Sequence, residues 1–567
     1  MGTQHPRKNA PSARRLRTPA AAPAAIAATA ARQPAAPETS TAAVPTASTT
    51  PPAAGLFGIS KQLYGEWARV MLGLSEREVP AKDPRFADPA WRDHPMYKRL
   101  GQGYLAFCQA ADRLAESRPD WRGRERARFL SGVVTSSLAP TNTLLGNPAA
   151  LKRVFETGGA SLVDGTKNML SDLVHKRGLP SQVKPGAFKV GENLAVTPGA
   201  VVFRNEMVEL IQYLPTTAQV CERPTLVIVP PIGKYYFLDL ARGRSFVEYA
   251  VARGVPTFIT SWRNPRKEHG AWGLDDYVQT CLDLVDVVSD IGRSKQINTL
   301  GMCAGGILTS LMLSVMAARS DKRVGAASFG VMLLDFGAEA PIHAFNAGPL
   351  LSLARKRSAS KGILPASNLA TVFAWMRPND LVWNYWSNNY LMGKQPPAFD
   401  ILAWSVDGTN LPATLHDQFL DIFRSDPLPK PGTLKVLGVP IDLGRVEIDV
   451  FATGALTDHL TPWKVCYRSA QLFGGSKTFV LSNSGHIASL VNPPGNPKAT
   501  YWVGPEPGAD ADAWLAKAAK KTGTWWEVWA EWTLARSGKL RAAPATLGSE
   551  RHPALVDAPG SYVRDPA

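Results

Sequence analysis

The sequence predicts an α/β protein, in which helices cover both faces of a mostly parallel sheet. Three observations favour this class. After about residue 199, short apolar runs typical of buried strands alternate with helical patterns. One such strand passes directly into a helix through the glycine-rich turn GMCAGG, residues 301–306. An aspartate and a histidine then follow two later strands, in that order.

The strand and helix patterns can be placed along the chain. The strand runs are continuously apolar, as in TLVIVPP, whereas DDYVQTCLDLVDVVSDIG has apolar residues at helical spacing. GGILTSLMLSVMAA is apolar nearly all round, as expected for a buried helix. The expected order is strand 225–231, strand 256–262, helix 275–292, strand 297–303, helix 305–318, strand 326–334, strand 446–458, helix near 462–473 and strand 477–486.

Other segments flank or interrupt this alternation. Residues 1–55 form an Ala/Pro-rich, basic tail that we expect to be disordered. Residues 56–200 carry helical patterns and are expected to form a mostly helical N-terminal domain, followed by the α/β domain at 201–567. Within that domain, residues 337–435 hold aromatic clusters and no clear strand, which predicts a cap or lid over the active site. A plain structural elaboration is the alternative.

Composition narrows the function classes. The 567 residues are 45% hydrophobic and 19% charged, an ordinary globular balance. A net charge of +16 favours polyanionic partners, of which nucleic acid is the weakest candidate because no zinc-finger spacing occurs. The five cysteines are scattered without a CxxC pair, which indicates a reducing, cytosolic setting. No uncharged apolar run reaches the roughly 20 residues of a transmembrane helix.

The turn GMCAGG has the spacing of G-x-S-x-G, the strained strand-to-helix turn that presents the nucleophile in α/β hydrolases, with Cys303 in place of serine. Gly301 and Gly305 let the turn close without Cβ clashes, and Gly306 lets the helix lie close to the strand. Cys303 would sit at a helix N-terminus, whose dipole favours the thiolate. The alternative is a buried structural cysteine with chance glycines.

Two later residues complete the pattern. In this fold the acid and the histidine follow the nucleophile in that order. TDHLTPW places Asp458 at the end of a strand, and SNSGHIASLVNPPGNP places His486 just after the last expected strand. We therefore expect Cys303, His486 and Asp458 to form a Cys-His-Asp site, with His459 in a structural or supporting role. No His/Cys cluster has ligand spacing, so no metal is expected.

The site also needs donors for a developing oxyanion. One is expected to be the backbone N–H of Ala304, directly after the nucleophile. The other is expected from the loop after the strand TLVIVPP, where Ile232 is the candidate and Gly233 the reserve.

Beyond these residues, the chain closely resembles the polyhydroxyalkanoate synthases, bacterial enzymes that polymerise 3-hydroxyacyl-CoA into storage polyester. The resemblance runs from about Leu56 to the C-terminus, and AQLFGG and NYWSNNYLMG are most similar to the single-subunit synthases. One departure is the loop PPIGKYY, which is one residue shorter than the usual PPxINKxY and has Gly233 in place of asparagine. The matching segments are RFADPAW, APTNTLLGNPAALKRVFETGGASLVDG, NLAVTPGAVVFRNEMVELIQY, SWRNP, GMCAGG, FAWMRPNDLVWNYW, TDHLTPWK and SGHIASLVNPPGNPK.

The resemblance implies the same catalytic residues, Cys303, Asp458 and His486. It implies an (R)-3-hydroxyacyl-CoA substrate and a polyester product, with CoA as part of the substrate and product and no separate cofactor. It also implies a cytoplasmic enzyme at the surface of the polyester granule, expected to be a homodimer. Granule-associated proteins are further candidate partners, whereas nucleic acid is not expected.

A thiol suits such a substrate because attack on a thioester exchanges one thioester for another at nearly equal free energy. The acyl-enzyme then stays activated for transfer to the 3-hydroxyl of a monomer or chain end, with Asp458 either orienting His486 or helping to deprotonate that hydroxyl. Lid aromatics would exclude water, although core packing is the alternative for part of them: Phe373, Trp375, Trp383, Tyr385 and Trp386.

Two other functions compete with polyester synthesis. A thioesterase or depolymerase on the same scaffold would transfer the acyl group to water, and a non-catalytic granule-coat protein would use its aromatic surfaces for adhesion.

Near the C-terminus, GTWWEVWAEWTLARSG places Trp525, Trp529 and Trp532 on one helical face. That face is expected either to contact the granule or a second subunit, or to cover the sheet.

Overall fold

A computed structural model describes residues 55–175, 179–337 and 348–567 of the chain. Almost all of the tail predicted at residues 1–55 therefore lies outside the described residues. Part of the predicted insertion, residues 338–347, lies outside them as well.

The described residues contain an 11-stranded mixed sheet, whose strands run β15-β14-β13-β12-β7-β6-β4-β5-β2-β1-β17 from one edge to the other. The six neighbouring strands from β13 to β5 are parallel, and the strands outside them are antiparallel. The α/β class predicted from the sequence is confirmed. The strands are β1 (Gly199–Arg204), β2 (Val208–Tyr213), β4 (Thr225–Ile228), β5 (Thr257–Trp262), β6 (Ile297–Met302), β7 (Val324–Gly330), β12 (Asp449–Ala455), β13 (Lys477–Ser482), β14 (Thr500–Val503), β15 (Ala519–Thr522) and β17 (Val556–Asp557).

Helices cover both faces of the parallel strands. The chain passes from β4 through α7 to β5 in one direction across the sheet, and then from β5 through α8 to β6 in the other. Because such crossovers are right-handed, α7 lies on one face and α8, α9 and α14 lie on the opposite face. The C-terminal helix α17 joins α7 on its face. These helices are α7 (Phe246–Ala252), α8 (Leu274–Gly292), α9 (Ala304–Ala318), α14 (Trp463–Gln471) and α17 (Trp525–Leu534).

The α7 and α17 side chains form one aromatic cluster. The ring of Phe246 lies 5.3 Å from Trp525, 5.3 Å from Trp526 and 4.7 Å from Trp529, measured between centroids. The indole of Trp529 donates a hydrogen bond to Ser328 Oγ on β7, at 3.1 Å. Trp529 is completely buried, and Trp532 is 8% exposed. Of the two predictions for this helix, covering the sheet is therefore the one the structure shows.

The structure differs from the predicted element boundaries in three ways. Strands β1 and β2 were not predicted as strands, and they extend the sheet beyond β5 in antiparallel pairing. β7 and β12 end earlier than predicted, at Gly330 and Ala455. β14 and β15 follow β13, so His486 lies after the last parallel strand and not after the last strand of the sheet.

The insertion between β7 and β12 is mostly helical in its described residues. The expectation that it lacks a clear strand is wrong only for two pairs of two-residue strands, β8 with β9 and β10 with β11. Two π-helical turns, η6 and η7, hold Trp383 and Trp386 of the predicted aromatic cluster, whereas Phe373 and Trp375 lie on α11. The elements of the insertion are α10 (Gly348–Lys361), β8 (Ile363–Leu364), α11 (Ala366–Met376), η6 (Asn379–Trp383), η7 (Trp386–Leu391), α12 (Asp400–Val406), β9 (Leu411–Pro412), α13 (Ala413–Ser425), β10 (Lys435–Val436) and β11 (Val439–Pro440).

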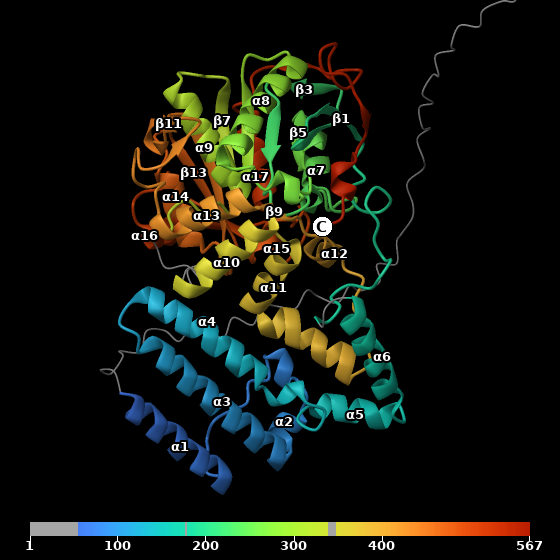
Figure 1. Cartoon of the computed structure of the whole chain (residues 1–567), viewed down its shortest axis with the longest axis vertical. Helices are drawn as coiled ribbons and strands as arrows, with labels where there is room; N and C mark the ends of the chain where they lie inside the picture. Colours follow the sequence, from blue (N-terminus) through green and yellow to red (C-terminus); the bar gives the residue numbers. More distant parts are fainter. Residues whose placement is uncertain (1–54, 176–178, 338–347) are drawn as a thin grey trace, which may run out of the picture. The chain divides into compact units, whose positions relative to one another are not determined.

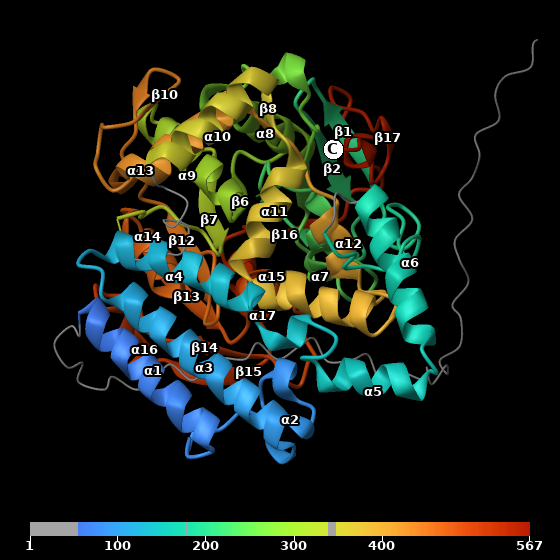
Figure 2. The ribbon, with the colours of Figure 1, turned by 60° about the horizontal axis from the view of Figure 1, so that its bottom comes forward.

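Six α-helices precede β1 in the described residues, and α1, α3 and α4 lie side by side (Figures 1 and 2). The last of them, α6, is held against the insertion. Asp172 accepts a hydrogen bond from Tyr390 at 2.9 Å, and a Cβ added to Gly165 would collide with the Tyr390 carbonyl oxygen. The helices are α1 (Leu56–Leu72), α2 (Ala90–Asp93), α3 (Pro95–Glu116), α4 (Trp121–Ser137), α5 (Pro148–Glu156) and α6 (Ala160–His175).

None of the helices in the described part of the chain is both long and apolar enough to span a bilayer.

The aromatic cluster between α7 and α17 gives a stability prediction. Phe246→Ala removes a completely buried ring and should lower the free energy of unfolding by about 3–5 kcal/mol. The matched control is Phe57→Ala, because the Phe57 ring is 84% exposed and its loss should change stability by less than about 0.5 kcal/mol. Denaturant unfolding of both variants measures the difference, and equal losses would contradict this description of the core.

Candidate active site

Cys303 occupies a strained turn between β6 and α9. Its backbone dihedrals are φ 48° and ψ −120°, in a region that non-glycine residues rarely adopt. Such conformations cost of order 1–3 kcal/mol and persist only where the surroundings hold them. Here the Cys303 N–H donates to the Gly330 carbonyl at the end of β7, at 2.8 Å, and the Cys303 carbonyl accepts from the Gly306 N–H at 2.8 Å.

The glycines around Cys303 leave no room for side chains. A Cβ on Gly301 would lie 2.6 Å from Thr309 Oγ1 and 2.8 Å from the Cα of Gly306. A Cβ on Gly305 would collide with the carbonyl oxygen of Ile228, the last residue of β4. The first turn of α9 therefore lies directly against the end of β4. This close approach explains the glycine spacing that the sequence shows.

Asp458 and His486 form a buried pair at the carboxyl edge of the sheet. Asp458 follows β12 by three residues, and His486 is the first residue of α15 (His486–Leu490), after β13. Their side chains, 0% and 5% exposed, are joined by a 2.7 Å hydrogen bond between Asp458 Oδ2 and His486 Nδ1. The other oxygen, Oδ1, accepts from the backbone N–H groups of Leu460 and Thr461 at 2.8 and 2.9 Å.

The electrostatics of this pair favour an imidazolium. Burial by itself would lower the pKa of His486, but the adjoining Asp458 carboxylate overcomes it and raises that pKa to about 10. The Cys303 side chain, as a hydrogen-bond partner of the ring, acts in the same direction. Burial opposes ionisation of Asp458, yet the His486 charge holds the pKa of its carboxyl below the usual value. The three predicted residues thus lie together.

Sequence reasoning missed Thr461. Its hydroxyl donates to Asp458 Oδ2 at 2.8 Å and lies 3.2 Å from His486 Nδ1, so it helps to fix both members of the pair. The hydroxyl three residues after the aspartate in TDHLT is the signal that could have identified it. His459 is half-buried, and burial together with the Arg377 guanidinium lowers its pKa to about 4, so its ring is neutral near pH 7.

The two predicted oxyanion donors lie on segments that this edge of the sheet brings together. Ala304 is the first residue of α9, so its N–H has no partner within the helix. Ile232 lies in the loop after β4, the strand whose end contacts Gly305. Their role as donors stays a prediction.

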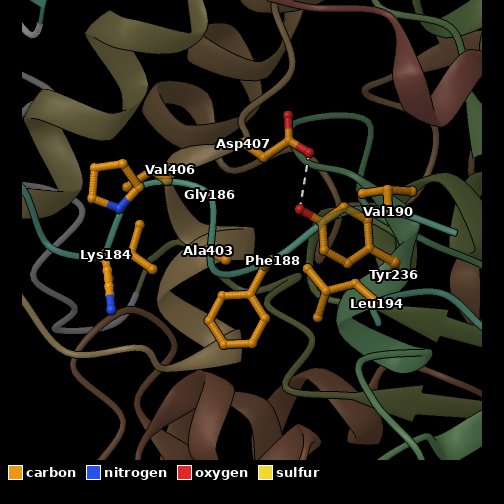
Figure 3. Close-up of a pocket in the computed structure, with 11 residues that line it drawn as sticks. Lys184, Gly186, Phe188, Val190, Leu194, Tyr236, Ala403, Val406 and Asp407 are labelled. Carbon is orange, nitrogen blue, oxygen red and sulfur yellow. Dashed lines mark hydrogen bonds between the residues drawn. The ribbon is translucent and has the colours of Figure 1, made fainter. Parts of the chain in front are cut away.

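A cavity lies next to this loop and apart from Cys303. Its volume is about 250 Å³, and its lining includes Phe188, Leu194, Tyr236 and Asp407 (Figure 3). Tyr236 Oη donates to Asp407 Oδ2 at 2.9 Å across it. In the parts of the chain that the structure describes, no group of three or more His, Cys, Asp or Glu residues could hold a metal ion.

The strand order, the strained turn and the buried Asp-His pair define an α/β-hydrolase-fold protein with cysteine at the nucleophile position. Comparison with known proteins agrees. Residues 238–493 match the family model of the alpha/beta hydrolase fold, and residues 82–250 match the poly-beta-hydroxybutyrate polymerase (PhaC) N-terminus.

Three relatives align over most of their length. The chain is 48% identical over 504 residues to poly(3-hydroxyalkanoate) polymerase 2 of Ectopseudomonas oleovorans, covering 88% of this chain and 90% of that protein. Polymerase 1 of the same organism is 46% identical over 88% and 89% of the two chains. The polymerase subunit PhaC of Cupriavidus necator is 38% identical over 89% and 87%. The chain belongs to the poly(3-hydroxyalkanoate) polymerase family and is an acyltransferase.

The Asp458–His486 pair predicts a pH-dependent contribution to stability. The raised pKa of His486 stabilises the folded chain. This contribution to the free energy of unfolding is fully present below the unfolded pKa of about 6.5 and is lost as the pH rises to about 10. The lowered pKa of Asp458 stabilises the folded chain above about pH 4. The stability lost in Asp458→Asn should therefore be largest between about pH 4 and 6.5, and should shrink by on the order of 1 kcal/mol per pH unit above that.

Urea denaturation of the wild-type and Asp458→Asn chains from pH 5 to pH 10 measures this effect. The control is Asp512→Asn, which removes an exposed ion pair with Lys464 and should show no comparable trend. A stability difference that grows between pH 6.5 and 10 would contradict an ionised Asp458–His486 pair.

Proposed function

We propose that the chain polymerises (R)-3-hydroxyacyl-CoA into polyester with release of CoA, through an acyl group carried on Cys303. The observation that carries the proposal is the convergence of Cys303, His486 and Asp458 at one edge of the sheet, with the thiol as a partner of the imidazole. The names of the relatives support the polyester product. The covalent route is our inference from the site.

Acylation would begin with the Cys303 sulfur as a thiolate beside the His486 imidazolium. The sulfur forms a bond to the thioester carbonyl carbon, and the carbonyl electron pair moves to its oxygen, which the N–H groups of Ala304 and Ile232 would stabilise. When the carbonyl re-forms, the bond to the CoA sulfur breaks and CoA leaves with the proton from His486. The acyl group remains on Cys303 as a thioester.

Elongation would use the same residues in the opposite roles, with His486 as proton acceptor and Cys303 as leaving group. His486, now neutral, accepts the proton of a 3-hydroxyl group as that oxygen attacks the acyl-cysteine, and the Cys303 thiolate leaves. We assign Asp458 to orienting His486. Its two oxygens already accept hydrogen bonds from the imidazole, the Thr461 hydroxyl and two backbone N–H groups, which leaves little room for a substrate hydroxyl.

Growth of a polymer requires that water stay away from the acyl-cysteine. We propose that aromatic rings of the insertion serve this purpose. The Trp375 and Trp383 rings lie 6.2 Å apart, and those of Trp383 and Trp386 lie 5.7 Å apart. Trp386 also donates to the Asn142 carbonyl at 3.0 Å, which ties this cluster to the N-terminal helices. A site lined by such rings would favour an apolar chain end over water.

The apolar product also motivates our proposal that the enzyme acts as a homodimer at the surface of a polyester granule in the cytoplasm. Granule-associated proteins would be further partners there. Sedimentation of the chain with isolated granules tests its location. Its mass in solution tests whether it is a homodimer.

The experiment that tests the function supplies 3-hydroxybutyryl-CoA and follows free CoA, insoluble polyester and the intact mass of the protein. The wild-type chain should release CoA, form polyester and gain acyl groups on Cys303. Cys303→Ala should lower CoA release by more than about 1,000-fold and remove the adduct. The matched control is Cys108→Ala, at a half-buried cysteine of α3, which should leave CoA release unchanged.

Two outcomes would contradict the proposal. Undiminished CoA release by Cys303→Ala would show that this thiol is not the nucleophile. Soluble 3-hydroxy acid formed at the rate of CoA release, without polyester, would identify a thioesterase on the same scaffold.

A further inference from the structure

Lys234 is a buried lysine in the loop that carries the proposed oxyanion donor Ile232. It is 2% exposed, a rare state for a lysine. Its ammonium group donates to the carbonyl oxygens of Asp565 at 2.6 Å and Tyr562 at 3.4 Å, near the C-terminal end of the chain. Two carbonyls more than 300 positions away along the chain thus hold one residue of this loop.

The other end of the loop is fixed on the sheet. The Val229 N–H donates to Thr260 Oγ1 at 3.1 Å, and the Val229 carbonyl accepts from the Trp262 indole at 2.9 Å. Both contacts come from β5. Pro230, Pro231, Ile232 and Gly233 therefore span the short distance between a fixed Val229 and a fixed Lys234.

The C-terminal segment is itself firmly attached, so it can serve as a reference point. The Glu209 carboxylate on β2, which is completely buried, accepts from the backbone N–H groups of Ser561 and Tyr562, both at 2.9 Å. The Tyr562 hydroxyl accepts from Arg263 at 2.7 Å. The amide of Asn264 donates to the Pro566 carbonyl.

The insertion contacts the same loop from another side. The Trp404 indole donates to the Lys234 carbonyl at 2.7 Å, and Gly233 forms an isolated β-bridge with Gly408. The loop is thus held by hydrogen bonds from the sheet, the C-terminal segment and the insertion.

We infer that Lys234 is a positioning residue, which, through its bonds to the C-terminal segment, holds the Ile232 N–H where the oxyanion of the acylation step develops. This inference rests on the proposed function, because it concerns the donor used in that step. An oxyanion donor acts only at a position fixed in advance, and a displacement of about 1 Å can cost up to about 100-fold in rate. The lysine itself touches neither substrate nor Cys303 in this assignment.

The test compares two reactions of the same thiol. Formation of acyl-Cys303 from 3-hydroxybutyryl-CoA in a single turnover needs the oxyanion donors. Alkylation of Cys303 by iodoacetamide does not, because it displaces iodide at a saturated carbon and places no charge on a carbonyl oxygen. Peptide mass spectrometry after rapid quenching measures both rates at Cys303.

The variant is Lys234→Met, which keeps the length of the side chain and removes its donors. Acylation should slow by about 10- to 100-fold, whereas alkylation should stay within about twofold of wild type. The matched control is Lys521→Met, at an exposed lysine on β15, which should change neither rate.

A second variant removes the acceptor of the same hydrogen bond instead of its donor. Removing residues 565–567 deletes the Asp565 carbonyl and also the Pro566 carbonyl that accepts from Asn264, and it leaves the Glu209 contacts with Ser561 and Tyr562 in place. It should give the same selective loss of acylation, and combination with Lys234→Met should add little, because both changes break the Lys234–Asp565 bond. This variant also tests the inference if Lys234→Met does not fold.

Unchanged acylation in both variants, or parallel loss of acylation and alkylation, would overturn the positioning role while leaving the proposed function intact. Absence of an acyl group on Cys303 in the wild-type chain would overturn the proposed function and this inference with it.

Discussion

The close approach of α9 to the end of β4 is the constraint on which the rest of the site depends. Only a glycine at position 305 allows it, since a Cβ there would collide with the Ile228 carbonyl. Cys303, two residues before this contact, has a positive φ and is half-buried against the core. The turn at Cys303, the start of α9 and the end of β4 therefore meet at one steric contact.

The charged side chains near this turn are each held in place by hydrogen bonds within the protein. Asp458 accepts hydrogen bonds from the Leu460 and Thr461 backbone as well as from His486, so its orientation is fixed from two sides, and the imidazole favours its ionised form. His486 then responds to Asp458 on one side and to the Cys303 thiol on the other. The result is an imidazole whose orientation is fixed by groups of the protein itself. The buried Lys234 side chain is likewise held by fixed groups, since both of its hydrogen bonds go to main-chain carbonyls.

The sequence predicted the parts of the fold and site that local patterns encode. The six parallel strands, β4, β5, β6, β7, β12 and β13, are largely buried, so they are mostly apolar and were recognised. β1 and β2 lie in GAVVFRNEMVELIQY, where polar residues such as Glu209 interrupt the apolar run, and they were missed. Cys303, Asp458 and His486 could be predicted because each follows a recognisable strand. Lys234 could not, because its partners lie 328 and 331 positions along the chain.

The contact between α6 and the insertion has a consequence for how the chain is made. Asp172 and Tyr390 are separated by 218 residues, so the helical segment leaves the ribosome well before the segment it binds. At about 5–20 residues per second, the delay is on the order of 10 to 40 s. During that interval Asp172 and the surface around Gly165 lack the partner that covers them in the folded chain.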